Sequence, residues 1–217
     1  MGMFLNSIEP YDKYKTITKG LYFVDKTELL EELIPALEQE QRFFCITRPR
    51  RFGKTVMANM IASFFEKSEG GSDIFDRLKI SEYPKYKEHL NKHDVVYIDF
   101  SEMPKECDSY KKYISRIEEG IYYDLREKYS DLYLKQEDAI WDIFSKIFNE
   151  TKKKFIFVMD EWDAVFHMSF MTEKNREDYL LFLKLLLKGQ SYVELAYMTG
   201  VLPIAKYSDG SELNMFL

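Results

Sequence analysis

The segment from Arg48 to Thr55 constrains the fold more than any other part of the chain. It reads Arg-Pro-Arg-Arg-Phe-Gly-Lys-Thr and lies between an apolar run, Phe43–Thr47, and a run with apolar residues at helical spacing, Val56–Phe65. Its last three residues fit the pattern G-x-x-x-x-G-K-[ST] of a phosphate-binding loop, in which a strand, a loop and a helix follow one another. Arg48 occupies the position of the first glycine, so the sequence predicts a variant of this loop.

Each residue type in the loop has a chemical reason. Gly53 lets the backbone approach phosphate oxygens, and consecutive N–H groups at the start of the following helix favour an anion. The Lys54 ammonium would reach the β- and γ-phosphates, and the Thr55 hydroxyl would bind Mg²⁺. The alternative is a basic surface turn before an ordinary helix, which the strand-loop-helix context disfavours.

The composition fits one domain with a sizeable core: 217 residues, 46% of them hydrophobic. The net charge of −6 gives no global basic field for nucleic acid, although a local basic patch stays open. Cys45 and Cys107 make no disulfide framework, so the reducing cytoplasm is the simplest location. No apolar run approaches the roughly 20 residues of a membrane span, and the N-terminus lacks the order of a signal peptide.

A second chemical signal is the expected strand Phe155–Asp160, an apolar run that ends in an acid and is followed by Glu161. A buried parallel strand would deliver Asp160 to Mg²⁺ at the carboxyl edge of a sheet, where open α/β folds bind ligands. Glu161 would orient and deprotonate the attacking water. An ordinary strand followed by a charged loop would have the same sequence pattern. The presence of Gly-Lys-Thr upstream favours the functional interpretation. Asp163 is a third carboxylate without a predicted role.

Two further strands are expected, over Val95–Phe100 and Leu195–Thr199. Thr199 is either a hydrogen-bonding partner of the attacking water or simply a polar exit from its strand. Asp99 is either a site residue or a strand terminator. Both alternatives remain open from the sequence.

Apolar periodicity predicts helices over 110–125, 140–147 and 179–187, and irregular or short helical pieces over 73–94. Residues 21–24 are expected to be a short strand or an extended piece. Asp25 is expected to begin a capping box over residues 25–28, in which Glu28 reaches back, for a helix that kinks or restarts at Pro35. His89 and His93 stand four residues apart, and without a third ligand a solvated pair is favoured over a metal site.

Together these segments resemble the signature blocks of the bacterial and archaeal AAA-ATPase-like family, which is related to AAA+ and signal-transducing P-loop ATPases. The resembling blocks are Tyr22–Lys26, Thr47–Thr55, Phe155–Asp163 and Thr199–Lys206. Members of that family also carry Arg at the first-glycine position, as Arg48 does here. The resemblance implies an α/β P-loop NTPase fold, with a mostly parallel sheet flanked by helices in three layers (α/β/α).

The resemblance also implies roles for individual residues. The ATP-binding residues, which include the Walker A loop, would be Asp25, Arg50, Arg51, Phe52, Gly53, Lys54, Thr55 and Val56. Walker B would be Asp160 and Glu161, with Thr55 and Asp160 as Mg²⁺ ligands and with Glu161 and Thr199 as catalytic residues. The block that contains Asp25 lies near the adenine in related ATPases, and Lys206 is a candidate phosphate sensor.

A strand order and a domain organisation follow from the same resemblance. The sensor strand that ends at Thr199 is expected between the P-loop and Walker B strands. Residues 1–217 are expected to form one P-loop domain, with residues 1–41 as a segment and helix leading into it. We expect a portion of a longer protein, cut before a fifth strand, a helical lid and a C-terminal nuclease-like domain of the PD-(D/E)xK type.

The leading interpretation is a cytoplasmic hydrolase domain that binds and hydrolyses ATP with Mg²⁺ and drives or gates a partner domain. One alternative is a nucleotide-binding switch that does not hydrolyse ATP. Another is a kinase for a small acceptor, which the Asp160-Glu161 pair disfavours. Direct nucleic-acid binding is disfavoured by the acidity of the chain, no membrane partner is expected, and oligomerisation is left open.

Overall fold

The computed structural model describes residues 2–67, 74–203 and 213–216. Four strands form a parallel sheet in the order β1-β4-β3-β2. The strands are β1 (Phe43–Thr47), β2 (Asp94–Asp99), β3 (Phe155–Asp160) and β4 (Val193–Gly200). Strand β4, which carries Thr199, therefore lies between β1 and β3, and the predicted strand order is confirmed.

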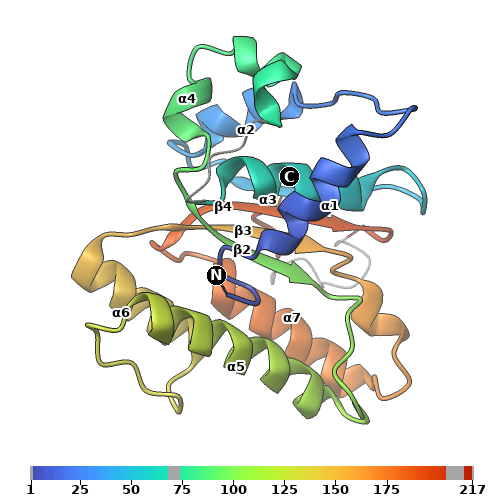
Figure 1. Cartoon of the computed structure of the whole chain (residues 1–217). Coiled ribbons are helices and arrows are strands. Elements are labelled where there is room, and N and C mark those ends of the chain that lie inside the picture. The colour runs from blue at the N-terminus through green and yellow to red at the C-terminus, as the bar shows by residue number, and fades with distance from the viewer. Residues whose placement is uncertain (1, 68–73, 204–212, 217) are drawn as a thin grey trace.

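Helices cover both faces of this sheet, which confirms the three-layer prediction (Figure 1). On one side lie α1 (Ile8–Thr18), α2 (Leu29–Ala36), α3 (Lys54–Phe65) and the short α4 (Tyr86–His89). On the other side lie α5 (Tyr110–Lys128), α6 (Ile140–Thr151) and α7 (Glu173–Leu187). Short 3-10 turns complete the described elements: η1 (Phe75–Arg77), η2 (Lys79–Glu82) and η3 (Ala164–His167). None of the helices in the described ranges has the length and apolar character of a bilayer span.

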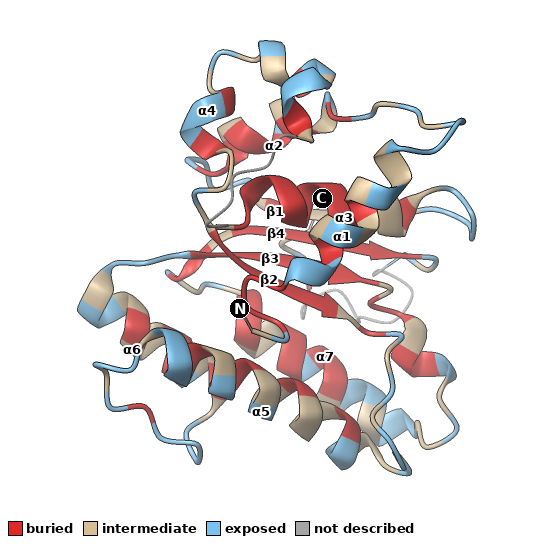
Figure 2. Ribbon diagram, in the orientation of Figure 1, coloured by how far each residue is buried: buried red, intermediate tan, exposed pale blue. Residues whose placement is uncertain are grey.

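Side chains along each strand alternate between two hydrophobic cores, as the pleat of a strand requires. On β3, Ile156 and Val158 face the core beneath α3, whereas Phe155, Phe157 and Met159 face the core beneath α5 to α7. The strand is buried along its whole length (Figure 2). Because both faces of a parallel sheet are covered by helices, a central strand reads as a continuous hydrophobic run.

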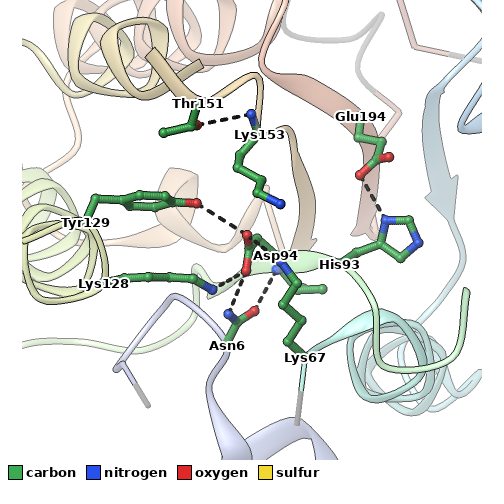
Figure 3. A network of polar contacts seen from close by, with 10 residues as sticks. Asn6, Lys67, His93, Asp94, Lys128, Tyr129, Thr151, Lys153 and Glu194 are labelled. Atoms are coloured by element: carbon green, nitrogen blue, oxygen red, sulfur yellow. Dashed lines mark hydrogen bonds and ion pairs between the residues drawn. The ribbon is translucent and has the colours of Figure 1, made fainter. Parts of the chain in front are cut away.

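A polar network ties the amino end of β2 to three other segments (Figure 3). Asp94, only 2% exposed, accepts hydrogen bonds from Asn6 Nδ2 (3.0 Å), Lys67 Nζ (3.0 Å) and Tyr129 Oη (3.3 Å), and it also pairs with Lys128. Burial alone would raise the pKa of Asp94, but the hydrogen bonds from Lys128, Asn6 and Lys67 hold it below its ordinary value. The network fixes the far end of α3 relative to the sheet and to α5.

The N-terminal part departs from the sequence predictions. The helix α1 was not predicted. Residues 21 and 22 lie in a turn and residues 23–26 in a loop, so the strand alternative for residues 21–24 is wrong. The helix α2 begins at Leu29 with Glu28 as its N-cap, and no side chain caps it. Asp25 instead accepts hydrogen bonds from Thr27 and from the backbone of Lys79, so the predicted capping box is wrong.

The His89 and His93 pair is not solvated, contrary to the prediction. The two rings stack with centroids 5.3 Å apart, and His89 Nδ1 lies 3.1 Å from His93 Nε2. His93 Nδ1 lies 3.0 Å from Glu194 Oε2 on β4. Burial, together with His93, lowers the pKa of His89. The pair therefore joins α4 to the amino ends of β2 and β4.

Candidate active site

The predicted phosphate loop connects the carboxyl end of β1 to the start of α3. Gly53 is the N-cap of α3, with φ 79° in the left-handed region, and it supplies no side-chain cap to the helix. Arg51 also has a positive φ, of 69°. Glycine adopts this conformation readily and other residues adopt it at a cost. The uncapped first turn of α3 therefore faces the loop with N–H groups that suit an anion.

Arg48 does not need the conformational freedom of a glycine. Its backbone does not have a positive φ. Its N–H donates to the Gly200 carbonyl at 3.1 Å. Arg48 thus continues the pairing of β1 with β4, and the loop turns later, at Arg51 and Gly53. This explains how arginine can occupy the position of the first glycine.

The Lys54 side chain lies inside the curve of the loop. It is 7% exposed, and its Nζ donates hydrogen bonds to the carbonyls of Arg48 (3.0 Å) and Pro49 (3.2 Å). The first turn of α3 thus carries a positive charge that is held within the loop backbone. The contact of Lys54 with phosphate stays a prediction.

Asp160, Glu161 and Thr199 come together at the carboxyl ends of β3 and β4. The Thr199 hydroxyl donates to Asp160 Oδ1, and the Glu161 N–H lies 3.1 Å from the same oxygen and 3.4 Å from Thr199 Oγ1. Asp160 is fully buried, and its Oδ2 has no hydrogen-bond partner among the described residues. One carboxylate oxygen is therefore oriented by the protein, and the other remains available to a ligand.

The charges at this edge of the sheet repel one another. Burial raises the pKa of Asp160 against the hydrogen bond from Thr199, and the nearby Asp99 raises it further. Burial, Asp160 and Asp99 all raise the pKa of Glu161, whereas Lys54 and Arg50 lower it. Asp99 is the partner of Asp160 in the β2–β3 register. A bound cation would relieve this repulsion.

The comparison with known families can now be placed beside this geometry. A family model for AAA-ATPase-like proteins, described as "Predicted AAA-ATPase", matches residues 8–208, most of the chain. The chain belongs to the AAA-ATPase-like family. The match confirms the expected family and supports a nucleotide-binding, ATPase-like domain. No match was found among curated proteins or among solved structures.

The donor set of this AAA-ATPase-like domain fits Mg²⁺. The unpartnered Asp160 Oδ2 is a buried oxygen acceptor, and the Thr55 side chain is close enough to lower the pKa of that carboxyl. Mg²⁺ prefers oxygen ligands and usually takes only one or two from the protein, the rest being water and substrate phosphate. The described residues hold no group of three or more His, Cys, Asp or Glu side chains arranged for a metal. A site of the one-carboxylate type is consistent with that finding.

A pocket of about 230 Å³ opens beside Gly53 in the AAA-ATPase-like domain. Its walls are mainly apolar side chains from α1, from residues 22–26 and from α3: Tyr14, Ile17, Tyr22, Phe23, Val24, Lys26, Val56, Met57 and Met60. Pockets for whole drug-sized ligands measure roughly 300–1,000 Å³. This pocket is smaller, and its walls suit a flat aromatic group attached to a phosphate chain.

The other predicted binding residues occupy different positions. Arg50, Arg51 and Phe52 are exposed at the tip of the loop. Asp25 is not part of the pocket wall. One of its carboxylate oxygens accepts from Thr27 N (2.9 Å) and Thr27 Oγ1 (2.7 Å), and the other accepts from Lys79 N (2.7 Å). Asp25 therefore anchors the block that forms the pocket.

Two acidic residues gain clearer positions than the sequence offered. Asp99 lies beside Asp160 in the β2–β3 register. The sequence indicated Asp99 only as an acidic residue near the end of an expected strand. Asp163 is 4% exposed and accepts hydrogen bonds from backbone N–H groups just after β4. No local pattern indicated that contact. Lys206 lies outside the described residues.

Proposed function

We propose that this domain binds ATP together with Mg²⁺ and hydrolyses it to ADP and phosphate. One observation carries the proposal: the phosphate loop and the Asp160-Glu161 pair meet at the carboxyl end of β4. The Arg48 N–H donates to the Gly200 carbonyl, and the preceding Thr199 hydroxyl donates to Asp160. Parallel α/β sheets bind ligands at this carboxyl edge. The carboxylate pair and the lysine then face the same phosphate chain.

The contacts divide the nucleotide between two subsites. The N–H groups at the start of α3 and the Lys54 ammonium would bind the phosphates. The base would enter the apolar pocket between residues 22–26 and α3. Thr55 and Asp160 would hold the magnesium ion, which would neutralise charge on the phosphates.

The chain's own residues then prepare a water molecule for attack. The water oxygen bonds to the γ-phosphorus, the bond from that phosphorus to the bridging oxygen of ADP breaks, and the water proton passes to the Glu161 carboxylate. The Thr199 hydroxyl donates a hydrogen bond to Asp160 and accepts one from the Glu161 N–H, so it orients the carboxylate pair. Arg50 places a positive charge near Glu161, where negative charge gathers during transfer.

Two substitutions test the assignment. Lys54→Ala removes the phosphate contact and should abolish ATP binding in calorimetry. Glu161→Gln should keep binding and lower phosphate release by about 10²-fold or more, the scale of general-base catalysis. Lys174→Ala, at an exposed lysine on α7, and Glu118→Gln, at a half-buried carboxylate on α5, are the matched controls.

The possible outcomes separate the alternatives. Undiminished ATP binding by Lys54→Ala would exclude the phosphate-loop assignment. Tight binding without phosphate release by the wild-type protein would indicate a nucleotide switch. ATP consumption that depends on an added small acceptor would indicate a kinase. We further propose that turnover drives or gates a partner domain, for which the nuclease-like domain suggested by the family resemblance is the candidate.

A further inference from the structure

The residues that follow β3 hold the end of β4 through consecutive contacts. Asp160 and the Glu161 N–H contact the Thr199 hydroxyl, and the Trp162 N–H donates to the Thr199 carbonyl at 2.9 Å. Asp163 continues this series on the residues after β4. Residues 160–163 and 199–202 therefore form a matched pair of segments.

The Asp163 carboxylate is the last contact in the series. Val201 N lies 3.1 Å from Oδ1 and 3.0 Å from Oδ2, and Leu202 N donates to Oδ2 at 2.8 Å. Asp163 is 4% exposed, so the accepting carboxylate is largely shielded from water. Hydrogen bonds to an ionised acceptor are roughly twice as strong as neutral ones.

Close packing leaves little room for the two segments to shift. A Cβ on Gly200 would lie 2.4 Å from Trp162 Nε1 and 2.8 Å from Asp163 Oδ1. Glycine lets the end of β4 approach the Asp163 side chain directly. A displacement of the Asp163 carboxylate would therefore shift the backbone at the end of β4.

On the β3 side the strand ladder ends before Thr199, whose carbonyl is held instead by the Trp162 N–H. The β3–β4 pairing ends at Met159 and Met198, one residue before Asp160 and Thr199. On the β1 side the pairing runs to Thr47 with Gly200, and the Arg48 N–H adds one more bond, to the Gly200 carbonyl. Beyond these points the backbone after β4 is bonded to Asp163. The Asp163 carboxylate therefore holds the two residues that follow β4, where the strand pairing has ended.

We propose that Asp163 is a positioning residue for ATP hydrolysis, because by holding residues 201–202 it keeps the Thr199 hydroxyl in register with Asp160 and Glu161. This inference rests on the proposed ATPase function and deepens it. Asp163 acts through Thr199 and does not itself touch the nucleotide. Its loss should slow the chemical step more than it weakens binding.

A double-mutant cycle tests this role. Asp163→Asn, Thr199→Val and the double variant would be compared with the wild-type protein for kcat, KM and ATP affinity in the presence of Mg²⁺. The matched control is Asp124→Asn on α5, because the Asp124 carboxylate also accepts three backbone hydrogen bonds, from Met3 (3.0 Å), Phe4 (2.7 Å) and Leu5 (2.9 Å). The control loses a similar set of bonds without touching the site.

The expected result is a selective and non-additive loss. Asp163→Asn should lower kcat about tenfold or more, with KM and ATP affinity within about twofold, and Asp124→Asn should change none of the three. In the double variant, Asp163→Asn should add little to the loss caused by Thr199→Val, since residues that act through one another do not contribute independently. Amide hydrogen exchange should rise in Asp163→Asn at residues 199–202 and not across the sheet.

Other outcomes overturn the positioning role. Additive losses in the cycle, an equal loss in Asp124→Asn, or faster exchange throughout the protein would each assign Asp163 to general stability. An Asp163→Asn variant as active as the wild type would remove the positioning role and leave the ATPase proposal intact. Failure of the wild-type protein to bind ATP would remove both.

Discussion

The Thr199 hydroxyl donates a hydrogen bond to the Asp160 carboxylate across the end of the β3–β4 pair, between residues 39 positions apart in the sequence. That bond occupies Oδ1, while Oδ2 has no partner in the part of the chain that the structure describes. The Glu161 N–H contacts the same two groups. The site therefore depends on the register of two neighbouring strands, which the sheet fixes before any ligand binds.

Thr199→Val replaces the hydroxyl by a methyl group of similar shape. Asp160 loses a donor and the Glu161 N–H loses an acceptor, so turnover should fall by about 10²-fold, the scale seen when one oriented hydrogen bond is removed from an active site. ATP affinity should change by no more than about twofold, since Thr199 lies outside the phosphate loop. Single-turnover phosphate release and calorimetry measure the two quantities. Thr18→Val, at the end of α1, is the control, and full turnover by Thr199→Val would contradict the role.

Asp99→Asn tests the electrostatics of the acidic edge. Glu161 acts as a base only when ionised, and its raised pKa means that activity is lost as the pH falls through that value. Removing the charge of Asp99 should lower the pKa of Glu161, so the acidic limb of the kcat/KM profile should move to lower pH. Asp108→Asn, at an exposed carboxylate before α5, should leave the limb in place. A limb that does not move in Asp99→Asn would show that Asp99 and Glu161 are not coupled.

The central strands could be predicted from sequence, and the N-terminal helix could not. The strands β1 and β3 were predicted with the same boundaries as observed, because a buried parallel strand is a continuous apolar run. The helix α1 buries only Pro10 and Tyr14 among eleven residues, so its sequence has no apolar stripe that would predict a helix. The spacing of apolar residues indicates which residues are buried, so it cannot predict a helix that buries few residues.

The candidate site divides in the same way. The phosphate-loop pattern and the apolar run before Asp160 are local, so Lys54 and Asp160 could be proposed as site residues from the sequence. The contacts of Asp25 with Lys79, and of Asp163 with residues 201–202, join segments 54 and 38 or more positions apart. The roles of Asp25 and Asp163 depend on the fold that brings these segments together. Local reading therefore made Asp25 a helix cap and gave Asp163 no role.

Two glycines with positive φ separate a backbone effect from a binding effect. Gly53 (φ 79°) and Gly189 (φ 71°) both have open space where a Cβ would lie. Alanine at either position should cost about 1 kcal/mol of stability for its left-handed conformation. Only Gly53→Ala should also weaken ATP binding, because its methyl group would stand in the phosphate loop. Urea unfolding and calorimetry on both variants check this, and equal ATP affinities would contradict it.

Tyr22→Ala tests the pocket beside Gly53. The Tyr22 side chain is 90% exposed although it lines the pocket, so its removal should leave thermal stability unchanged. ATP affinity should fall about threefold to tenfold if the ring contacts the base, on the scale of aromatic contacts of about 1 kcal/mol. Affinity for tripolyphosphate, which has no base, should be unaffected. The control is Tyr133→Ala, at a ring 73% exposed after α5. Equal losses for ATP and tripolyphosphate would place the base elsewhere.

Glu66 at the end of α3 makes stability depend on pH. It is 4% exposed, and burial raises its pKa from 4.5 to about 8, although Lys128 opposes the shift. Between these two values the folded protein keeps a proton that the unfolded chain releases, so stability is lost as the pH rises. Glutamine resembles the protonated acid and removes that loss.

Glu66→Gln should therefore match the wild type near pH 4.5 and exceed it at pH 8 by on the order of 2 kcal/mol. Urea unfolding at both pH values measures the difference. Glu150→Gln, at an exposed position on α6, should give the wild-type pH dependence. A gain of equal size at both pH values would mean that glutamine packs better at this site, and it would contradict the assignment of the effect to the buried proton.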